Sequence, residues 1–322
     1  MRIGIVGAGM AGLACAEGLA MRGHEVVLLD KGRGPGGRMS MRRLQTAAGV
    51  AHFDHGAQYF TVRDPSFRRR VDAWIAEGAV APWPPAGSGA YVGAPAMNAP
   101  VRQMAKGQDV RWSSLVTKIE SGSAGCRLFI EGGDVLGVDF VIVAVPAEQA
   151  AALLASVAPD LATRASAAAS EPCWTVMLAF AEAVATGQDC CRGNDGVVRW
   201  AARNNSKPGR SGPESWVVQA GPDWSRRHLE ADSDWVAATL TAALSRQLDV
   251  VLPPSVGAAS HRWRFARSAA EGSSAILDLD RQLGLCGDWL IGPRVESAWV
   301  SGAALADALG EAVPAHGRSV PE

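Results

Sequence analysis

The first thirty residues show two hydrophobic patterns in turn. Residues 2–6 (RIGIV) form a short apolar run, which is typical of a buried parallel strand. Residues 13–23 (LACAEGLAMRG) have helical spacing and close on a glycine, a common helix C-terminus. Residues 25–29 (EVVLL) form a second apolar run that ends at Asp30. The pattern predicts a strand–helix–strand unit.

Glycines fill the turn between the first strand and the helix. In the Gly-x-Gly-x-x-Gly spacing, the first glycine allows a tight turn, the second lets the backbone approach a pyrophosphate, and the third lets the helix pack closely. The helix N-terminus offers N–H groups to phosphates, and a carboxylate ending the second strand can accept from ribose hydroxyls. The predicted nucleotide contacts in this part of the chain are Gly7, Gly9, Met10, Ala11, Gly12, Asp30 and Lys31.

This fingerprint does not distinguish FAD from NAD(P). Lys31 and Arg33 follow the acidic residue and are also compatible with the 2′-phosphate of NADP. A second glycine-rich stretch, residues 32–39 (GRGPGGRM), favours FAD because it resembles the Arg-x-Gly-Gly-Arg element of the flavin amine oxidase superfamily. The resemblance implies that Gly36 and Gly37 pass along the FAD pyrophosphate and that Arg38 lies near the phosphates and the flavin.

The C-terminal part of the sequence carries a second signal. Gly287 and Asp288 follow an apolar run, and the segment 294–302 (RVESAWVSG) then begins a helix. The segment resembles the FAD signature of the same superfamily. The resemblance implies that Asp288 bonds a ribityl hydroxyl and that the helix N-terminus points at the flavin pyrimidine edge, where it would stabilise the negative charge of reduced flavin. The predicted flavin contacts added here are Val116, Gly287, Asp288, Ser297, Ala298 and Trp299.

The remaining patterns predict an α/β fold in which a Rossmann-type FAD-binding domain carries an inserted, mostly antiparallel α+β substrate domain. We expect the FAD-binding domain to comprise residues 1–62, 97–155 and 276–312, and the substrate domain to comprise residues 63–96 and 156–275. Helices are predicted at 65–77, 97–106, 234–248 and 296–309. Strands are predicted at 40–43, 50–62, 139–145, 174–180, 197–202, 215–220 and 261–265.

Composition narrows the function classes. The 322 residues are 48% hydrophobic and have a formal net charge of −1, which argues against nucleic acid or an anionic membrane as the main partner. No apolar run approaches the ~18 residues of a transmembrane helix. Six cysteines without metal-ligand spacing indicate a reduced, cytoplasmic protein that holds no metal. The oligomeric state stays open.

Six stretches resemble the renalase family more specifically than amine oxidases at large. The resemblance implies a non-covalent FAD oxidase that takes hydride from the 2- or 6-dihydro isomers of NAD(P), returns NAD(P)+ and reduces O2 to H2O2. Phe265, where relatives would have Tyr, and Ser297, where Gly is usual, depart from the family pattern. The stretches are 30–43 (DKGRGPGGRMSMRR), 53–67 (FDHGAQYFTVRDPSF), 91–98 (YVGAPAMN), 200–210 (WAARNNSKPGR), 216–225 (WVVQAGPDWS) and 261–266 (HRWRFA).

Hydride transfer from a dihydropyridine needs a planar, mostly apolar site rather than a general base. Alternation on the strand 261–265 places His261 and Trp263 on one face, and we expect them to contact the substrate together with His55, Gln58 and Tyr59. Each of the five also has a structural interpretation as a core aromatic or a buried polar residue. The segment 204–207 (NNSK) is interpreted either as a polar substrate loop or as a surface turn.

Two other functions stay open. One is an oxidase or dehydrogenase of amines or of a larger polycyclic substrate. The other is a flavin-binding protein with a regulatory role and no turnover. Cys286 lies close to the flavin segment, so a covalent flavin is a further, less favoured alternative.

Overall fold

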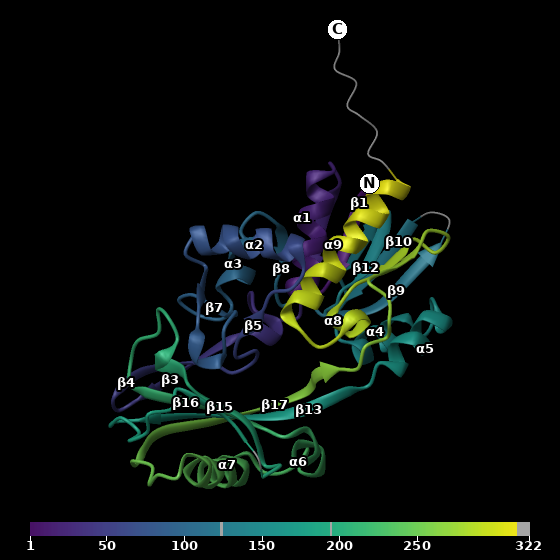
Figure 1. Ribbon diagram of the computed structural model, residues 1–322. Coiled ribbons are helices and arrows are strands. Elements are labelled where there is room, and N and C mark those ends of the chain that lie inside the picture. The colour runs from purple at the N-terminus through teal and green to yellow at the C-terminus, as the bar shows by residue number, and fades with distance from the viewer. Residues whose placement is uncertain (123–124, 194, 314–322) are drawn as a thin grey trace. The chain divides into compact units, whose positions relative to one another are not determined.

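The protein, seen in a computed structural model, divides into two compact units (Figure 1). The structure describes residues 1–122, 125–193 and 195–313. Unit 1 comprises Met1–Gly37, Val101–Ala169 and Ser268–Glu322, and unit 2 comprises Arg38–Pro100 and Ser170–Arg267. No helix in the described ranges is long and apolar enough to cross a membrane.

We expect an FAD-binding domain of three segments and a substrate domain of two. Unit 1 has three segments and unit 2 has two, but their boundaries differ from the expected ones. Residues 38–62 and 97–100 belong to unit 2, and residues 156–169 and 268–275 belong to unit 1. The hairpin that we placed with the nucleotide-binding strands instead packs on the sheet of unit 2, where Phe53 joins the apolar cluster of Met177 and Val217.

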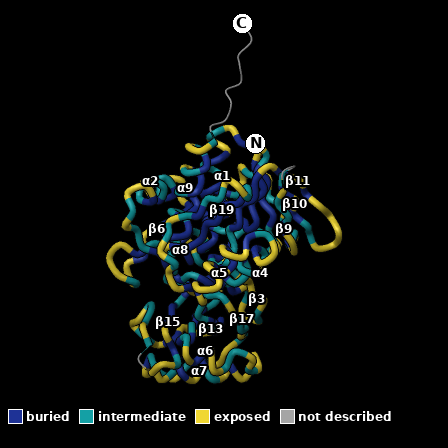
Figure 2. Tube along the Cα trace, turned by 90° about the vertical axis from the view of Figure 1, so that its right-hand side faces the viewer, coloured by how far each residue is buried: buried dark blue, intermediate teal, exposed yellow. Residues whose placement is uncertain are grey.

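Unit 1 is built on a six-stranded sheet in the order β18-β19-β12-β1-β2-β8. The pairs are parallel except that β18 runs antiparallel to β19. The apolar runs of the sequence become its central strands, which are almost entirely buried (Figure 2). The strands are β1 (Arg2–Val6), β2 (Glu25–Leu29), β8 (Asp109–Arg111), β12 (Phe140–Val143), β18 (Ile276–Asp278) and β19 (Leu283–Leu285).

The first and last long helices pack against each other in unit 1 (Figure 1). These are α1 (Met10–Met21) and α9 (Val295–Ala312). Small residues permit the close approach, because a Cβ at Gly302 would lie 2.1 Å from the Ala11 carbonyl oxygen and one at Gly18 would lie 2.6 Å from Ala306 Cβ. The helix α3 (Ala99–Ala105) begins in the last two residues of a unit 2 segment and continues in unit 1. The remaining elements of unit 1 are β9 (Val116–Gly122), β10 (Gly125–Ile130), β11 (Val135–Val138), α4 (Ala147–Leu154), α5 (Pro159–Ala167) and α8 (Asp288–Ile291).

Unit 2 contains a five-stranded sheet in the order β14-β15-β16-β13-β17. Its strands are β13 (Ser170–Phe180), β14 (Cys190–Arg192), β15 (Val198–Arg203), β16 (Glu214–Ala220) and β17 (Ser255–Ser268). Alternation along β13 sends Trp174, Val176 and Leu178 into one core with α7 (Ser233–Leu248) and α6 (Pro222–Arg227). The predicted strand at 261–265 is therefore the middle of a longer strand that lies at the edge of this sheet.

Smaller elements complete unit 2. They are the hairpin β3 (Met41–Thr46) and β4 (Gly49–Asp54), the three-stranded sheet of β5 (Phe60–Thr61), β7 (Ala90–Gly93) and β6 (Val80–Pro82), the helix α2 (Pro65–Ala76) and the 3-10 turns η1 (Gly37–Met39), η2 (Pro84–Ala86) and η3 (Asn204–Ser206). The single strand predicted at 50–62 is wrong, because the chain leaves the extended conformation after Asp54 and resumes at Phe60. The intervening backbone packs directly on another segment, since a Cβ at Gly56 would lie 2.0 Å from the Arg38 carbonyl oxygen.

Candidate flavin and substrate sites

The glycine-rich loop of unit 1 has two glycines that the fold requires and one that it does not. Gly7 has a φ of 105°, and a Cβ on Gly12 would lie 2.0 Å from the Gly7 carbonyl oxygen. A Cβ on Gly9 would meet no protein atom within 4 Å. The loop therefore leaves space at the position where the fingerprint expects a pyrophosphate, and these residues fit a dinucleotide.

Asp30 holds this loop to the end of β2. Its carboxylate accepts the backbone N–H groups of Ala8 at 2.7 Å and of Gly32 at 2.6 Å. The residue predicted to accept from a ribose thus already fixes the turn that would hold the phosphates. Lys31 donates to the Gln149 side chain at 3.2 Å on the surface of unit 1, so its ammonium is engaged with α4 rather than with the glycine-rich turn.

The C-terminal flavin segment lies in the same unit. Cys286 follows β19, and the Gly287 N–H donates to Ser301 Oγ of α9 at 2.9 Å. Asp288, at the start of α8, is buried with 6% of its surface exposed. Because α9 packs on α1, the segment comes together with the helix that follows the glycine-rich loop. The two sets of predicted flavin contacts therefore belong to one unit.

Four other predicted flavin residues differ in their surroundings. Ser297 and Ala298 are buried in the first turn of α9, and Trp299 is half-buried. Val116 is the first residue of β9, and its side chain lies in the core of unit 1. The Val116 side chain is thus taken up by core packing.

Arg38 is the first residue of unit 2, whereas Gly36 and Gly37 end the first segment of unit 1. The Arg38 carbonyl oxygen accepts the Ala57 N–H at 2.9 Å, which fixes the backbone of Arg38 to the turn that follows β4.

Cys286 and Cys15 are neighbouring thiols in the core of unit 1. Both side chains are fully buried. Burial raises the pKa of the Cys15 thiol well above its usual value, and a hydrogen bond with Cys286 raises it further. A buried thiol engaged with a second thiol is poorly suited to form a flavin bond.

His55, His261 and Trp263 form a compact ring cluster in unit 2. The His55 and Trp263 rings stack with centroids 5.2 Å apart, and His261 meets Trp263 edge-on at 4.3 Å. The Trp263 indole N–H donates to the His55 carbonyl oxygen at 2.9 Å. The alternation along β17 thus places His261 and Trp263 beside a histidine that is about two hundred residues away in the sequence.

Both imidazoles of this cluster are neutral at pH 7. Burial lowers the pKa of His55 to about 4, and the charges of His261 and Arg42 act in the same direction. Burial also lowers the pKa of His261, again assisted by Arg42. The cluster is therefore an uncharged aromatic surface in the positive field of an arginine.

Gln58 and Tyr59 have partners other than the rings of this cluster. The Gln58 amide donates to the carbonyl oxygens of Asp54 and Gly56, and its oxygen accepts from Lys207. Gln58 thus ties the segment together and has little hydrogen-bonding capacity left for a substrate. Tyr59 packs against Trp200 with ring centroids 5.2 Å apart.

The turn that contains Asn204 and Lys207 differs from the surface turn that its composition suggests. Both residues are only 1% exposed, so this is not a surface turn. The Lys207 ammonium contacts Asp54 Oδ2 at 3.3 Å, Gln58 Oε1 at 3.1 Å and Asn204 Oδ1 at 3.3 Å. Arg210 shares the same carboxylate oxygen of Asp54 at 2.6 Å. Burial lowers the pKa of Lys207 to about 8 against the opposing effect of Asp54.

Sequence reasoning missed this charge cluster, which fixes the segment leading to His55. The motif NNSKPGR has the composition of an exposed turn. Its ionic partner Asp54 lies 153 residues away, so no local pattern indicates the pairing.

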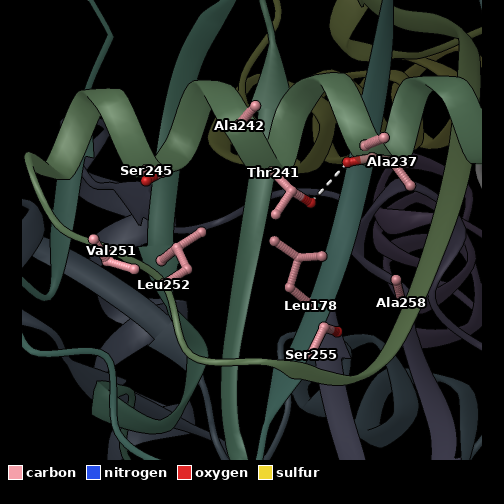
Figure 3. Close-up of a pocket in the computed structure, with 10 residues that line it drawn as sticks. Leu178, Ala237, Thr241, Ala242, Ser245, Val251, Leu252, Ser255 and Ala258 are labelled. Atoms are coloured by element: carbon pink, nitrogen blue, oxygen red, sulfur yellow. Dashed lines mark hydrogen bonds between the residues drawn. The ribbon is translucent and has the colours of Figure 1, made fainter.

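A separate apolar pocket of about 510 Å³ lies between α7 and the five-stranded sheet (Figure 3). Leu178, Thr241 and Leu252 are among its lining residues, and none of the lining side chains is ionisable. Leu178 belongs to the α7 core, whereas its neighbour Met177 packs with Phe53 on the other face. None of the residues predicted from the sequence lines this pocket.

Comparison with known proteins identifies the class of protein. The family described as flavin containing amine oxidoreductase matches residues 85–309, and a Rossmann-like NAD(P)-binding domain matches residues 5–74. The chain therefore belongs to the flavin-containing amine oxidoreductase family and is a flavin-dependent oxidoreductase. The Rossmann-type α/β fold with its inserted sheet is confirmed.

Solved structures share this fold at low sequence identity. A candidate protoporphyrinogen oxidase from Exiguobacterium sp. 255-15 is 12% identical with a TM-score of 0.72, and the match covers 97% of this chain and 99% of that one. Cyclohexylamine oxidase from Brevibacterium oxydans IH-35A is 13% identical with the same TM-score and coverage. A redesigned putrescine oxidase is 12% identical with a TM-score of 0.59, covering 96% of this chain and 99% of that one.

Proposed function

We propose that this protein is a renalase-like oxidase that binds FAD non-covalently and takes hydride from a 2- or 6-dihydro isomer of NAD(P). Unit 1 would hold FAD through the glycine-rich loop and Asp288. His55, His261 and Trp263 of unit 2 would contact the dihydropyridine ring. FAD, when bound, accepts hydride at its N5 atom and is reoxidised by O2 and a proton, with release of H2O2.

The observation that carries this proposal is the ring cluster itself, in which Trp263 stacks on His55 and meets His261 edge-on. His55 and His261 are neutral at pH 7, and the charge of Arg42 lowers the pKa of both. A protonated amine would meet the same repulsion from Arg42 as a protonated imidazole. A neutral dihydropyridine meets no such penalty, and its planar ring suits the face of Trp263.

The residues of this cluster would bind and orient the ring rather than move a proton. Hydride leaves a C–H bond, so no O–H or N–H bond of the substrate has to break. A neutral imidazole offers one N–H donor and one ring nitrogen acceptor, which together can satisfy a carboxamide. The hydrogen bond from Trp263 to the His55 backbone fixes the angle at which the indole is presented.

Anaerobic flavin reduction tests the proposal directly. We expect isomerised NADH to bleach the flavin absorbance of the purified protein rapidly after anaerobic mixing. Cyclohexylamine or putrescine should leave the flavin absorbance unchanged. Aerobic turnover of the same donor should yield H2O2 and NAD+ in equal amounts.

The family match and the fold of the solved amine oxidases support an alternative, the oxidation of an amine or of a larger polycyclic donor. Bleaching by an amine and not by isomerised NADH would replace the proposal with this alternative. Bleaching by no donor, with flavin bound at full stoichiometry, would refute both.

A further inference from the structure

The face of unit 2 that carries the ring cluster also carries arginines that the proposed hydride transfer does not use. Residues two apart on a strand share a face, so Arg267 follows His261, Trp263 and Phe265 on the same side of β17. Four residues of strand separate Trp263 from Arg267, which corresponds to about 13 Å. A cation is thus placed beyond one end of the aromatic surface.

A second arginine is fixed in place by aromatic neighbours. The Arg192 guanidinium donates to the Tyr59 hydroxyl at 2.9 Å and lies 5.2 Å above the centre of the Trp200 ring. Trp200 faces Arg192 across the β14–β15 pair. These contacts reduce the freedom of an exposed arginine, so less entropy is lost when it binds an anion.

Arg199 is the residue before Trp200 on β15, and it interacts electrostatically with Arg267. Its guanidinium is 3.8 Å from the Glu171 carboxylate. Burial lowers the pKa of Arg267, and the charge of Arg199 lowers it further, whereas Glu171 and Tyr59 act in the opposite direction. Arg199 and Arg267 therefore repel each other, and the Glu171 carboxylate beside Arg199 offsets part of their charge.

We infer that Arg192, Arg199 and Arg267 bind the diphosphate of a dinucleotide substrate whose nicotinamide ring lies on Trp263. The inference rests on the proposed function, because the ring is placed by that proposal. A diphosphate carries two negative charges, which match the excess of two positive charges in this arginine group. Guanidinium groups bind phosphate oxygens in a bidentate manner. The distance along β17 leaves room for a ribose between the ring and the diphosphate.

The diphosphate, which takes no part in the hydride transfer, should distinguish one substrate from another. Isomerised NADH carries the diphosphate, whereas the isomerised dihydro form of N-benzylnicotinamide has the same ring without any phosphate. The protein should bind the dinucleotide more tightly than the phosphate-free donor and reduce its flavin with both at comparable limiting rates.

Stopped-flow flavin reduction with both donors tests the arginines. Arg199→Gln and Arg267→Gln should each raise the Kd of isomerised NADH about tenfold, with an unchanged limiting rate and an unchanged Kd for the phosphate-free donor. Arg226→Gln is the matched control, because Arg226 pairs with Asp223 on the surface of unit 2. Added salt should weaken the binding of isomerised NADH and leave the binding of the phosphate-free donor unchanged.

An unchanged Kd for isomerised NADH in both variants would overturn the inference and leave the arginines as a solvated surface. A wild-type protein whose flavin neither donor reduces would instead refute the proposed function. In that case isothermal titration of the holoprotein with ADP-ribose decides the inference independently. Binding that Arg267→Gln abolishes would support the anion site, and the absence of binding to wild type would overturn it.

Discussion

The buried ammonium of Lys207 should impose a measurable pH dependence on the stability of unit 2. Burial lowers the pKa of Lys207 from 10.5 to about 8. Between these two values the unfolded chain keeps the proton that the folded chain has lost. The unfolded state then binds more protons, so the free energy of unfolding rises with pH across this window, and below pH 8 the contribution is constant.

The size of the effect follows from the shift. A difference of about 2.5 pKa units corresponds to roughly 3 kcal/mol between the two ends of the window. Most of it is reached before the upper end, with about 1.4 kcal/mol gained by pH about 9 and about 2.5 kcal/mol by pH about 10. The buried thiols act in the opposite direction, because burial raises the pKa of Cys173 and of Cys191 to about 11.

Comparison with the variant Lys207→Met separates these contributions. Equilibrium unfolding in urea, followed by tryptophan fluorescence under reducing conditions, gives the free energy of unfolding at each pH. The difference between wild type and Lys207→Met should rise by about 2 kcal/mol between pH about 7.5 and about 10, since the thiol contributions cancel. Lys106→Met, at an exposed position, should show no such rise. A flat difference would refute the reasoning, and a falling one would show that the attraction of Asp54 exceeds the cost of burial.

Four further predictions concern the candidate sites. Gly9→Val should fold normally but purify without flavin, since the Gly9 backbone is extended with a φ of −81° and a Cβ there meets no protein atom. Gly12→Val should instead lose soluble protein, because its Cβ would clash with Gly7. A yellow Gly9→Val protein would remove the loop from the cofactor site. Asp288→Ala should weaken flavin binding by roughly 1–3 kcal/mol, measured as the Kd of released FAD, and an unchanged Kd would limit Asp288 to the start of α8. Trp263→Ala should slow flavin reduction or raise the donor Kd while FAD stays bound and reoxidation by O2 is little changed; a lowered melting temperature with normal kinetics would make it a core residue. Because burial lowers the pKa of His55 to about 4, the unfolded chain takes up this proton first and stability should fall as the pH drops from about 6.5 to about 4, a slope that His55→Phe should reduce in acid titrations followed by circular dichroism.

The sequence predicted those parts of the molecule that depend on local periodicity. The glycine-rich turn, the central strands of unit 1 and the helices at 65–77 and 234–248 have patterns that only one kind of element satisfies. The pairing of His261 with Trp263 on one face followed from strand alternation alone. Their contact with His55 did not, because the resemblance suggested these residues without indicating which of them meet.

Features that depend on long-range pairing were not predictable. The break at residues 55–59 is set by the close approach of Gly56 to the Arg38 backbone, and the apolar pattern of this stretch suggests a continuous strand. The Gln58 amide oxygen accepts from Lys207, a partner that lies far away in the sequence and that no local pattern indicates. The unit boundaries differ from the expected ones for the same reason, since the hairpin of β3 and β4 packs on the sheet of unit 2 through Phe53.

The packing of α9 on α1 has a consequence for how the chain folds during synthesis. The sheet of unit 1 has β19 beside β12, and α1 is covered by α9, so unit 1 stays incomplete until α9 leaves the ribosome. Both segments of unit 2 are synthesised before that point. The contacts of unit 1 are thus of high sequence separation, which slows folding and leaves the apolar face of α1 uncovered until α9 has been synthesised. A premature stop ahead of α9 would therefore expose Ala11 and Ala14 and direct the product toward aggregation or proteolysis.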